Sequence, residues 1–168
     1  FPRSVGQLPL FYNHLNTGRP DPDSRMFNRY ASNYLDESNE PLYPFGYGLS
    51  YTDFVYGELQ ISSETLPKNG ELTVSVTVTN KGNYDGYETV QLYLHDIYAE
   101  IARPVKELKG FERVFLKSGE SRDVKFVITE DDLKFYNSEL HYVYEPGEFD
   151  VMVGPNSRDV QTKSFQAK

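Results

Sequence analysis

The sequence predicts an all-β fold, an antiparallel β-sandwich preceded by an irregular N-terminal extension. Between residues 53 and 168, short stretches of alternating apolar and polar residues recur, and Gly, Pro and Asn separate them. About seven such strands, spaced about 8–12 residues apart, are typical of a β-sandwich. Residues 1–42, in contrast, are rich in Pro, Asn, Arg and Tyr and show little periodicity. That composition is typical of loops.

Each strand of the predicted sandwich shows an alternation of apolar residues. In residues 72–79, Leu and Val alternate with Thr and Ser, which is the period of two of a strand with one buried face. In residues 89–94, the same alternation directs Val90, Leu92 and Leu94 toward the core. Further strands are predicted at residues 54–62, 105–116 (one strand or two), 124–128, 142–144 and 149–153 and in a last segment that ends near Phe165.

Two connections in the second half of the sandwich can be predicted in more detail. Residues 142–144 are expected to pair with residues 149–153 around the turn Glu145-Pro146-Gly147. Residues 130–136 are expected to form a short helix, because Thr129 is a good N-cap and acidic residues fill the first turn.

The extension offers one candidate strand, over Gln7–Asn13, in which Leu8, Leu10 and Tyr12 alternate with Pro9 and Phe11. The internal Pro restricts it to the edge of a sheet or to the start of a strand. We expect this segment to pack on the rest of the domain, to pair with a neighbouring chain, or to be poorly ordered. Residues 26–30 and 34–35 could form single helical turns.

Composition excludes several classes of function. The chain has 168 residues, of which 38% are hydrophobic, and a net charge of −8, with a mean hydropathy of −0.60 and a pI near 4.9. Its apolar runs are far shorter than the roughly 20 residues of a transmembrane helix, so we expect no membrane partner. The negative charge makes a nucleic-acid partner unexpected, since phosphate binding needs a basic face. The absence of cysteine rules out disulfides and thiolate metal sites.

Residues 43–52, which we call the aromatic latch, separate the two halves of the chain. Pro44 restricts the backbone, and Gly46 and Gly48 allow either a positive φ or a close approach to another surface. Tyr43, Tyr47 and Tyr51 alternate along the segment and could share one face. Such a face could stack on a sugar ring, but it more often forms a seam between domains. The candidate latch residues are Tyr43, Phe45, Gly46, Tyr47, Gly48 and Tyr51.

Three groups of neighbouring carboxylates could supply the pair of acids that acid–base catalysis uses. Asp36 and Glu37 precede the aromatic latch, and Asp21 and Asp23 lie in a loop segment. The run Glu130-Asp131-Asp132 lies where a helix would begin, and acids there stabilise the helix dipole. We expect a structural or solvated role for all three groups, with Asp36 and Glu37 as the pair to watch.

The remaining side chains indicate no metal and no cofactor. His14, His95 and His141 are far apart and share no metal-ligand spacing. The segment Phe45-Gly46-Tyr47-Gly48 lacks the strand–helix context of a phosphate-binding loop. Arg103 and Lys106, beside Glu107, are expected to form a loop or interdomain ion pair, which would contribute only about 0–1 kcal/mol if exposed.

Specific strings of residues follow one another along almost the whole chain. They are Phe1-Pro2-Arg3-Ser4-Val5-Gly6-Gln7, Tyr12-Asn13-His14, Asn16-Thr17-Gly18-Arg19-Pro20, Tyr34-Leu35-Asp36-Glu37, residues 41–52 and Arg103-Pro104-Val105-Lys106-Glu107-Leu108-Lys109-Gly110-Phe111. In this order and spacing they resemble the C-terminal region of a family 3 glycoside hydrolase, and most of all a bacterial periplasmic β-glucosidase.

This resemblance implies a fold, a division into domains and a function. Residues 1–18 would end a catalytic α/β sandwich domain, residues 19–52 would form a linker with the aromatic latch, and residues 53–168 would form a fibronectin type III-like, immunoglobulin-like β-sandwich. The parent enzyme would release terminal β-D-glucosyl residues by a retaining mechanism in the periplasm. Because no initiator Met is present, we expect the chain to be part of a longer protein.

The resemblance also implies which part of such an enzyme this chain lacks. In the family, the nucleophilic Asp lies in an N-terminal barrel and the acid/base Glu in the middle domain, and neither motif occurs here. We therefore expect the chain to be inactive alone, to contact the upstream catalytic domains and to meet β-glucosides only through the parent. The alternative is a polysaccharide- or protein-binding module, which a solvent-facing row of Tyr84, Tyr87 and Tyr93 would favour.

Overall fold

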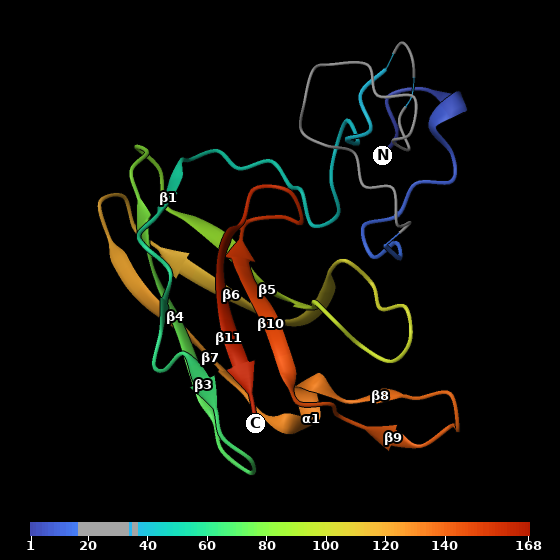
Figure 1. The fold of residues 1–168 in the computed structure, drawn as a ribbon. Helices are drawn as coiled ribbons and strands as arrows, with labels where there is room; N and C mark the ends of the chain where they lie inside the picture. Colours follow the sequence, from blue (N-terminus) through green and yellow to red (C-terminus); the bar gives the residue numbers. More distant parts are fainter. Residues whose placement is uncertain (17–33, 35–36) are drawn as a thin grey trace.

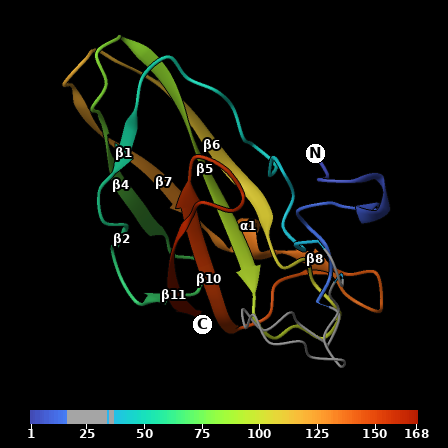
Figure 2. The same ribbon diagram turned by 90° about the horizontal axis from the view of Figure 1, so that it is seen from above.

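The computed structural model describes residues 1–16, 34 and 37–168. Two β-sheets face each other, and the N-terminal extension lies to one side of them (Figures 1 and 2). In one sheet the central strand β4 pairs with β7 on one edge and with β1 and β2 on the other. Its strands are β1 (Phe54–Tyr56), β2 (Gln60–Ile61), β4 (Leu72–Asn80) and β7 (Ser121–Ile128).

The second sheet has five strands in the order β3-β11-β10-β5-β6. All neighbours are antiparallel except β3 and β11, which are parallel. Its strands are β3 (Thr65–Leu66), β5 (Gly86–Asp96), β6 (Glu107–Leu116), β10 (Gly147–Gly154) and β11 (Gln161–Ala167). The predicted all-β sandwich is therefore confirmed.

The core between the sheets consists of the residues that the alternation directed inward. In β4, Leu72, Val74, Val76 and Val78 are buried, whereas the Thr and Ser residues between them are half-buried or exposed. From the opposite sheet, β5 contributes Val90, Leu92 and Leu94, and β10 contributes Phe149, Val151 and Val153. Burial of these aliphatic and aromatic side chains is the main favourable contribution to folding.

Three details differ from the predicted strand pattern. The expected strand at residues 54–62 is interrupted after Tyr56, and both of its parts, β1 and β2, pair with β4. Tyr142–Val143 forms β9, which pairs with β8 (Phe135–Tyr136) in a separate two-stranded sheet, so its predicted pairing with residues 149–153 is wrong. Residues 149–153 instead lie in β10, between β11 and β5.

The predicted short helix is present as α1 (Glu130–Leu133) and ends early because β8 begins at Phe135. Thr129 caps it as expected: the Thr129 backbone N–H donates to the Asp132 carboxylate at 2.8 Å, and the Thr129 hydroxyl donates to it at 3.0 Å. The acidic run at residues 130–132 thus forms the first turn of this helix.

The expected edge strand at Gln7–Asn13 is wrong. Val5–Gln7 forms a 3-10 helix, η1, and within the described residues the extension pairs with the sandwich through one isolated bridge, Leu15 to Pro104. Gln7 is buried, and its side-chain amide nitrogen donates hydrogen bonds to the Ser38 and Glu40 carbonyl oxygens at 2.7 and 3.1 Å. Gln7 therefore ties the start of the extension to its own residues 38–40 by side-chain hydrogen bonds rather than by a β-ladder.

Some predictions lie outside the described residues, namely Asp21, Asp23, Asp36, residues 26–30 and the predicted turn at 34–35 beyond Tyr34. The domain boundaries at 18/19 and 52/53 also stay predictions. Among the described residues, no helix is long and apolar enough to cross a membrane.

Asn80, at the end of β4, ties the two sheets together and should be indispensable for stability. Its buried amide accepts from the Thr52 hydroxyl at 2.6 Å and the Gly82 N–H at 3.1 Å, and donates to the carbonyl oxygens of Tyr84 and Leu116 at 2.8 and 3.1 Å. Asn80→Ala leaves these buried groups without a partner and should lower the free energy of unfolding by about 2–4 kcal/mol. Denaturant titration measures this.

Asn83, which is exposed three residues later, supplies the matched control. Asn83→Ala should change the free energy of unfolding by less than about 0.5 kcal/mol. Equal effects of the two substitutions would contradict the role assigned to Asn80.

Glu88 should make the stability of the sandwich depend on pH. It lies on the inward face of β5 and accepts a hydrogen bond from the Tyr56 hydroxyl at 2.7 Å; burial raises its pKa, and the Tyr56 hydrogen bond partly opposes this. Because its pKa is raised in the folded state, protonated Glu88 contributes to the free energy of unfolding. This contribution is complete below the unfolded-state pKa, near pH 4.3, and is lost as the pH rises through the folded-state pKa. Glu88→Gln should therefore become increasingly more stable than the unsubstituted chain from pH 4 to pH 8.

Denaturant titrations at several pH values test this, with exposed Glu112 as the control position. Glu112→Gln should give a stability difference that is nearly independent of pH. The role of Glu88 is refuted if the two variants show the same pH profile.

Candidate functional site

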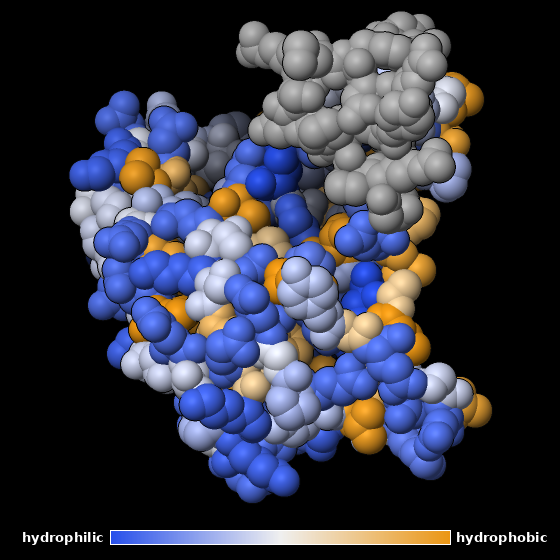
Figure 3. All heavy atoms as spheres, in the orientation of Figure 1, coloured by the Kyte–Doolittle hydropathy of each residue, from blue (hydrophilic) through white to orange (hydrophobic). Residues whose placement is uncertain are grey.

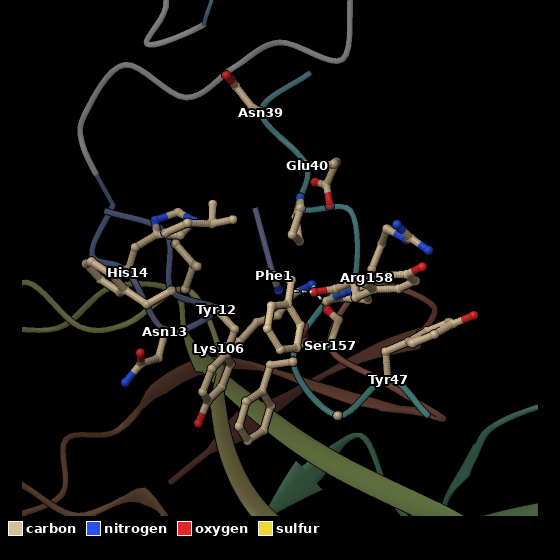
Figure 4. Close-up of a pocket in the computed structure, with 18 of the residues that line it drawn as sticks. Phe1, Tyr12, Asn13, His14, Asn39, Glu40, Tyr47, Lys106, Ser157 and Arg158 are labelled. Atoms are coloured by element: carbon tan, nitrogen blue, oxygen red, sulfur yellow. Dashed lines mark hydrogen bonds between the residues drawn. The ribbon is translucent and has the colours of Figure 1, made fainter. Parts of the chain in front are cut away.

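A groove of about 1000 Å³ lies between the extension, the aromatic latch and the sandwich. Figure 4 shows the side chains that line it, which come from all three parts of the chain. Tyr12 and His14 belong to the extension, Tyr47 to the latch, and Lys106 and Arg158 to loops of the sandwich. The groove thus marks where the irregular first part of the chain meets the sandwich.

The latch is fastened to the sandwich at Gly46. Gly46 has a φ of 79° and occupies the third position of a turn in which the Tyr47 N–H donates to the Pro44 carbonyl at 3.2 Å. The Gly46 carbonyl accepts a hydrogen bond from the amide of Gln91 at 3.1 Å. A Cβ on Gly46 would lie 2.0 Å from the Gln91 side-chain oxygen, so only glycine allows this approach.

Gln91 lies on the face of β5 that points away from the core, yet it is only 4% exposed. Its amide nitrogen also donates to the Pro155 carbonyl at 2.7 Å, and its oxygen accepts from the Tyr93 hydroxyl at 2.5 Å. Each polar atom of this buried side chain therefore has a partner, as buried polar groups require. Gln91 joins the latch, β5 and the loop after β10.

Aromatic rings complete this contact. The Tyr12 ring stacks on the Phe45 ring, with centroids 4.1 Å apart and planes at 15°, and it meets the Tyr93 ring edge-on at 5.9 Å. Tyr93 is fully buried, and burial is the main cause that raises the pKa of its hydroxyl. The Phe45 carbonyl accepts from the Ser157 N–H at 2.9 Å. Residues from the extension and the latch thus cover the outer face of β5.

The loop before β6 reaches the same place. The Val105 N–H donates to the His14 carbonyl at 2.9 Å, beside the bridge from Pro104 to Leu15. The Lys106 ammonium donates to the Ser157 carbonyl at 2.6 Å, and burial lowers its pKa, with Glu40 opposing the shift. Motifs that are distant in the sequence therefore meet around one groove.

The predicted ion pair in this loop is confirmed for Arg103 but wrong for Lys106. Arg103 pairs with Glu107 at 3.1 Å and lies 3.6 Å from Asp96, and its side chain is only 8% exposed, so the pair is not a surface one. Lys109, rather than Lys106, is the lysine that pairs with Glu107, at 2.9 Å. Burial raises the pKa of Asp96, and the Arg103 guanidinium opposes this shift.

The remaining aromatic side chains of the latch and Leu49 are exposed. Tyr43 and Tyr47 contact each other with ring centroids 5.1 Å apart, and Phe1 meets Tyr43 edge-on. Leu49 and Tyr51 are 91% and 97% exposed. A Cβ added at Gly48 would meet no atom within 4 Å, so Gly48 lacks the close approach that distinguishes Gly46.

Apolar residues also reach the surface beside the extension and at the β8–β9 hairpin (Figure 3).

The row of tyrosines that would favour a binding module does not form. Tyr84 and Tyr87 are exposed, but Tyr93 is buried beneath Tyr12. The guanidinium of Arg113 lies 3.9 Å from the centre of the Tyr87 ring and covers one of its faces. The outer face of β5 therefore presents no continuous aromatic platform.

The remaining candidates lie apart from the groove or at its rim. His14 lines the groove, His95 lies in β5, and His141 lies in the β8–β9 turn, 3.5 Å from Glu139. Glu37 is 3.8 Å from Arg3. Within the described part of the chain, no three His, Asp or Glu side chains gather as metal ligands.

Sequence reasoning missed Gln91 and Ser157 as contact residues. It included Tyr12 and Gln7 only within a segment for which packing on the rest of the domain was one of three alternatives, and the contact of Tyr12 with Tyr93 agrees with that alternative. The alternation of β5 placed Gln91 on the solvent side, and nothing in the local pattern indicated that another segment covers it. The one signal was Gly46, because a glycine within an aromatic stretch can mark a close backbone approach.

Gly46 and Gly48 give a matched test of this contact. Gly46→Ala forces a Cβ against Gln91 in a left-handed conformation and should lower the free energy of unfolding by about 1–3 kcal/mol. It should also speed hydrogen exchange at the Ser157 amide, which donates to Phe45. Gly48→Ala should change neither quantity measurably. Similar effects of both substitutions, measured by denaturant titration and exchange, would overturn the role of Gly46.

Comparison with known proteins agrees with these motifs. Residues 88–157 match the fibronectin type III-like domain family. The chain is 51% identical to the periplasmic β-glucosidase of Salmonella typhimurium over 99% of its own length but 22% of that protein. The crystal structure of a β-glucosidase from Listeria innocua superposes with a TM-score of 0.89 at 47% identity, and covers 99% of this chain and 23% of that one.

A further solved structure is that of a family 3 glycoside hydrolase. The family 3 glycoside hydrolase β-glucosidase of Bifidobacterium adolescentis matches with a TM-score of 0.69 at 36% identity, and covers 76% of this chain and 19% of that one. The chain thus spans about a fifth of the relatives that it matches. The resemblance that its motifs indicated is confirmed: the chain carries the fibronectin type III-like domain of family 3 glycoside hydrolases and is similar to a bacterial periplasmic β-glucosidase.

Proposed function

We propose that the chain is the non-catalytic C-terminal region of a β-glucosidase and that it braces the catalytic domains of that enzyme. The whole protein would release terminal non-reducing β-D-glucosyl residues with retention of configuration, in the periplasm. The observation that carries this proposal is the match along 99% of this chain to only 22% of a periplasmic β-glucosidase. The bulk of such an enzyme lies outside the matched region.

The surface of the latch supports a bracing role. Its first part is fixed to the sandwich by Gln91 and Ser157, whereas Leu49 and Tyr51 are held exposed beyond it. Large exposed apolar and aromatic side chains on an anchored segment are typical of an interface with another domain. The exposed rings of Phe1, Tyr43 and Tyr47 continue this surface.

The buried carboxylates support a non-catalytic role. A retaining glycosidase needs two carboxylates about 5 Å apart that face the sugar. Glu88 and Asp96 have raised pKa values, but Glu88 faces the core beside Tyr56 and Asp96 faces Arg103. Neither is placed to reach a sugar, and we expect the catalytic pair in the preceding domains.

A chimera tests the proposal. This chain would replace the corresponding region of the Salmonella typhimurium β-glucosidase, and hydrolysis of p-nitrophenyl β-glucoside would be measured for the chimera, for a truncated enzyme without the region, and for this chain alone. The chimera should be active and more heat-resistant than the truncated enzyme, and this chain alone should be inactive.

The outcome that overturns the catalytic part of the proposal is hydrolysis by this chain alone, and Asp36 and Glu37 would then be the first residues to replace. Equal activity and heat resistance of the truncated enzyme and the chimera would overturn the bracing role. Tyr51→Ala in the chimera serves as a surface probe, since it should weaken the chimera but leave the isolated chain as stable as before.

A further inference from the structure

A buried cluster of charges lies at the base of the loop that carries residues 97–106. The side chains of Arg103 and Asp96 are 8% and 4% exposed. One guanidinium nitrogen of Arg103, Nη2, donates to Glu107 at 3.1 Å, and its carbon Cζ lies 4.4 Å from the centre of the Phe135 ring. Arg103 is thereby held between the start of β6 and the strand β8.

Two atoms of this cluster lack a hydrogen-bond partner within the described part of the chain, namely Asp96 Oδ2 and Arg103 Nη1. They lie 3.6 Å apart, which is close enough for an ion pair but too far for a hydrogen bond. A buried polar atom without a partner is costly, and more so when it is charged. One of these atoms is an acceptor and the other a donor.

Both residues line a small space of about 10 Å³. Its other walls include Leu94, Leu133 and Phe149 from the core and Pro104 from the loop. A space of this size is close to the smallest that holds one water molecule. A water needs two to four polar partners, and the two unpaired atoms provide the first two.

We propose that this space is a binding site for a single water molecule, which accepts a hydrogen bond from Arg103 Nη1 and donates one to Asp96 Oδ2. Water fits better than an ion, because carboxylates from Asp96, Glu107 and Asp132 and cations from Arg103 and Lys109 all line the space. A bound cation would contact the Arg103 guanidinium, and a bound anion would contact the carboxylates.

The hydrated pair positions the loop that reaches the extension. Pro104 and Val105 follow Arg103 directly and contact Leu15 and His14. The Arg103 guanidinium already contacts Glu107 in β6 and the Phe135 ring in β8. The bound water would add a hydrogen-bonded link from Arg103 to Asp96 in β5. This inference does not rest on the proposed function.

A crystal structure of this chain at about 1.5 Å resolution or better tests the site directly. An ordered water within hydrogen-bond distance of Asp96 Oδ2 and Arg103 Nη1 is expected. An empty space, a metal ion, or direct closure of the two atoms into one hydrogen bond would each overturn the proposal.

Solution measurements on variants give a second test that does not require crystals. Asp96→Leu fills the space and removes the hydrogen-bond acceptor. It should therefore abolish the cross-peak between water and the Arg103 guanidinium in NMR spectra. It should also speed hydrogen exchange at the Val105 amide roughly tenfold or more, because the loop loses one of its attachments. Asp96→Asn keeps an acceptor oxygen and should retain the cross-peak.

Lys109→Met is the matched control, because Lys109 lines the space and pairs with Glu107 but contacts neither unpaired atom. It should leave the water cross-peak in place and the exchange of Val105 nearly unchanged. Absence of the cross-peak in the unsubstituted chain, or its persistence in Asp96→Leu, would contradict a bound water.

Discussion

The hydrogen bond from Gln91 to Gly46 is the interaction on which the arrangement of the chain depends. It joins the outer face of β5 to the aromatic latch at a distance of 3.1 Å, and it exists only because Gly46 has no side chain to strike Gln91. Beside this hydrogen bond, Tyr12 packs against Tyr93 and the Phe45 ring stacks on Tyr12. The middle of β5, residues 90–94, is therefore buried on both faces, on one by the opposite sheet and on the other by segments that precede the sandwich.

Two buried amide side chains of the sandwich are fully paired. Gln91 and Asn80 each occupy a site closed to water, and every polar atom of their side chains has a partner. A buried amide without partners would cost more than the hydrogen bonds gain. Such side chains fix one arrangement of the connecting segments, because any shift would leave several groups unpaired at once.

The same arrangement places side chains of unequal exposure on one continuous segment. Phe45 is fixed against Tyr12, while Leu49 and Tyr51, a few residues further along, are almost fully exposed. The latch is held by hydrogen bonds at Phe45 and Gly46 and again at Thr52, with the exposed residues between them. A segment held in this way can present a fixed surface to a second domain at little cost in conformational entropy. This links the local chemistry of Gly46 to the bracing role proposed for the region.

The sequence by itself determined the sandwich, most of its strands and the cap of α1, because alternation and capping depend on neighbouring residues. The tertiary structure alone decided that β9 pairs with β8, that Gln7–Asn13 forms no strand, and that Gln91 and Tyr93 are buried. These depend on contacts between segments far apart in the chain, and local periodicity is the same whether the outer face of a strand meets water or another segment. Of the candidate site, Gly46 was predicted from its own sequence context, whereas its partner Gln91 could be found only in the folded chain.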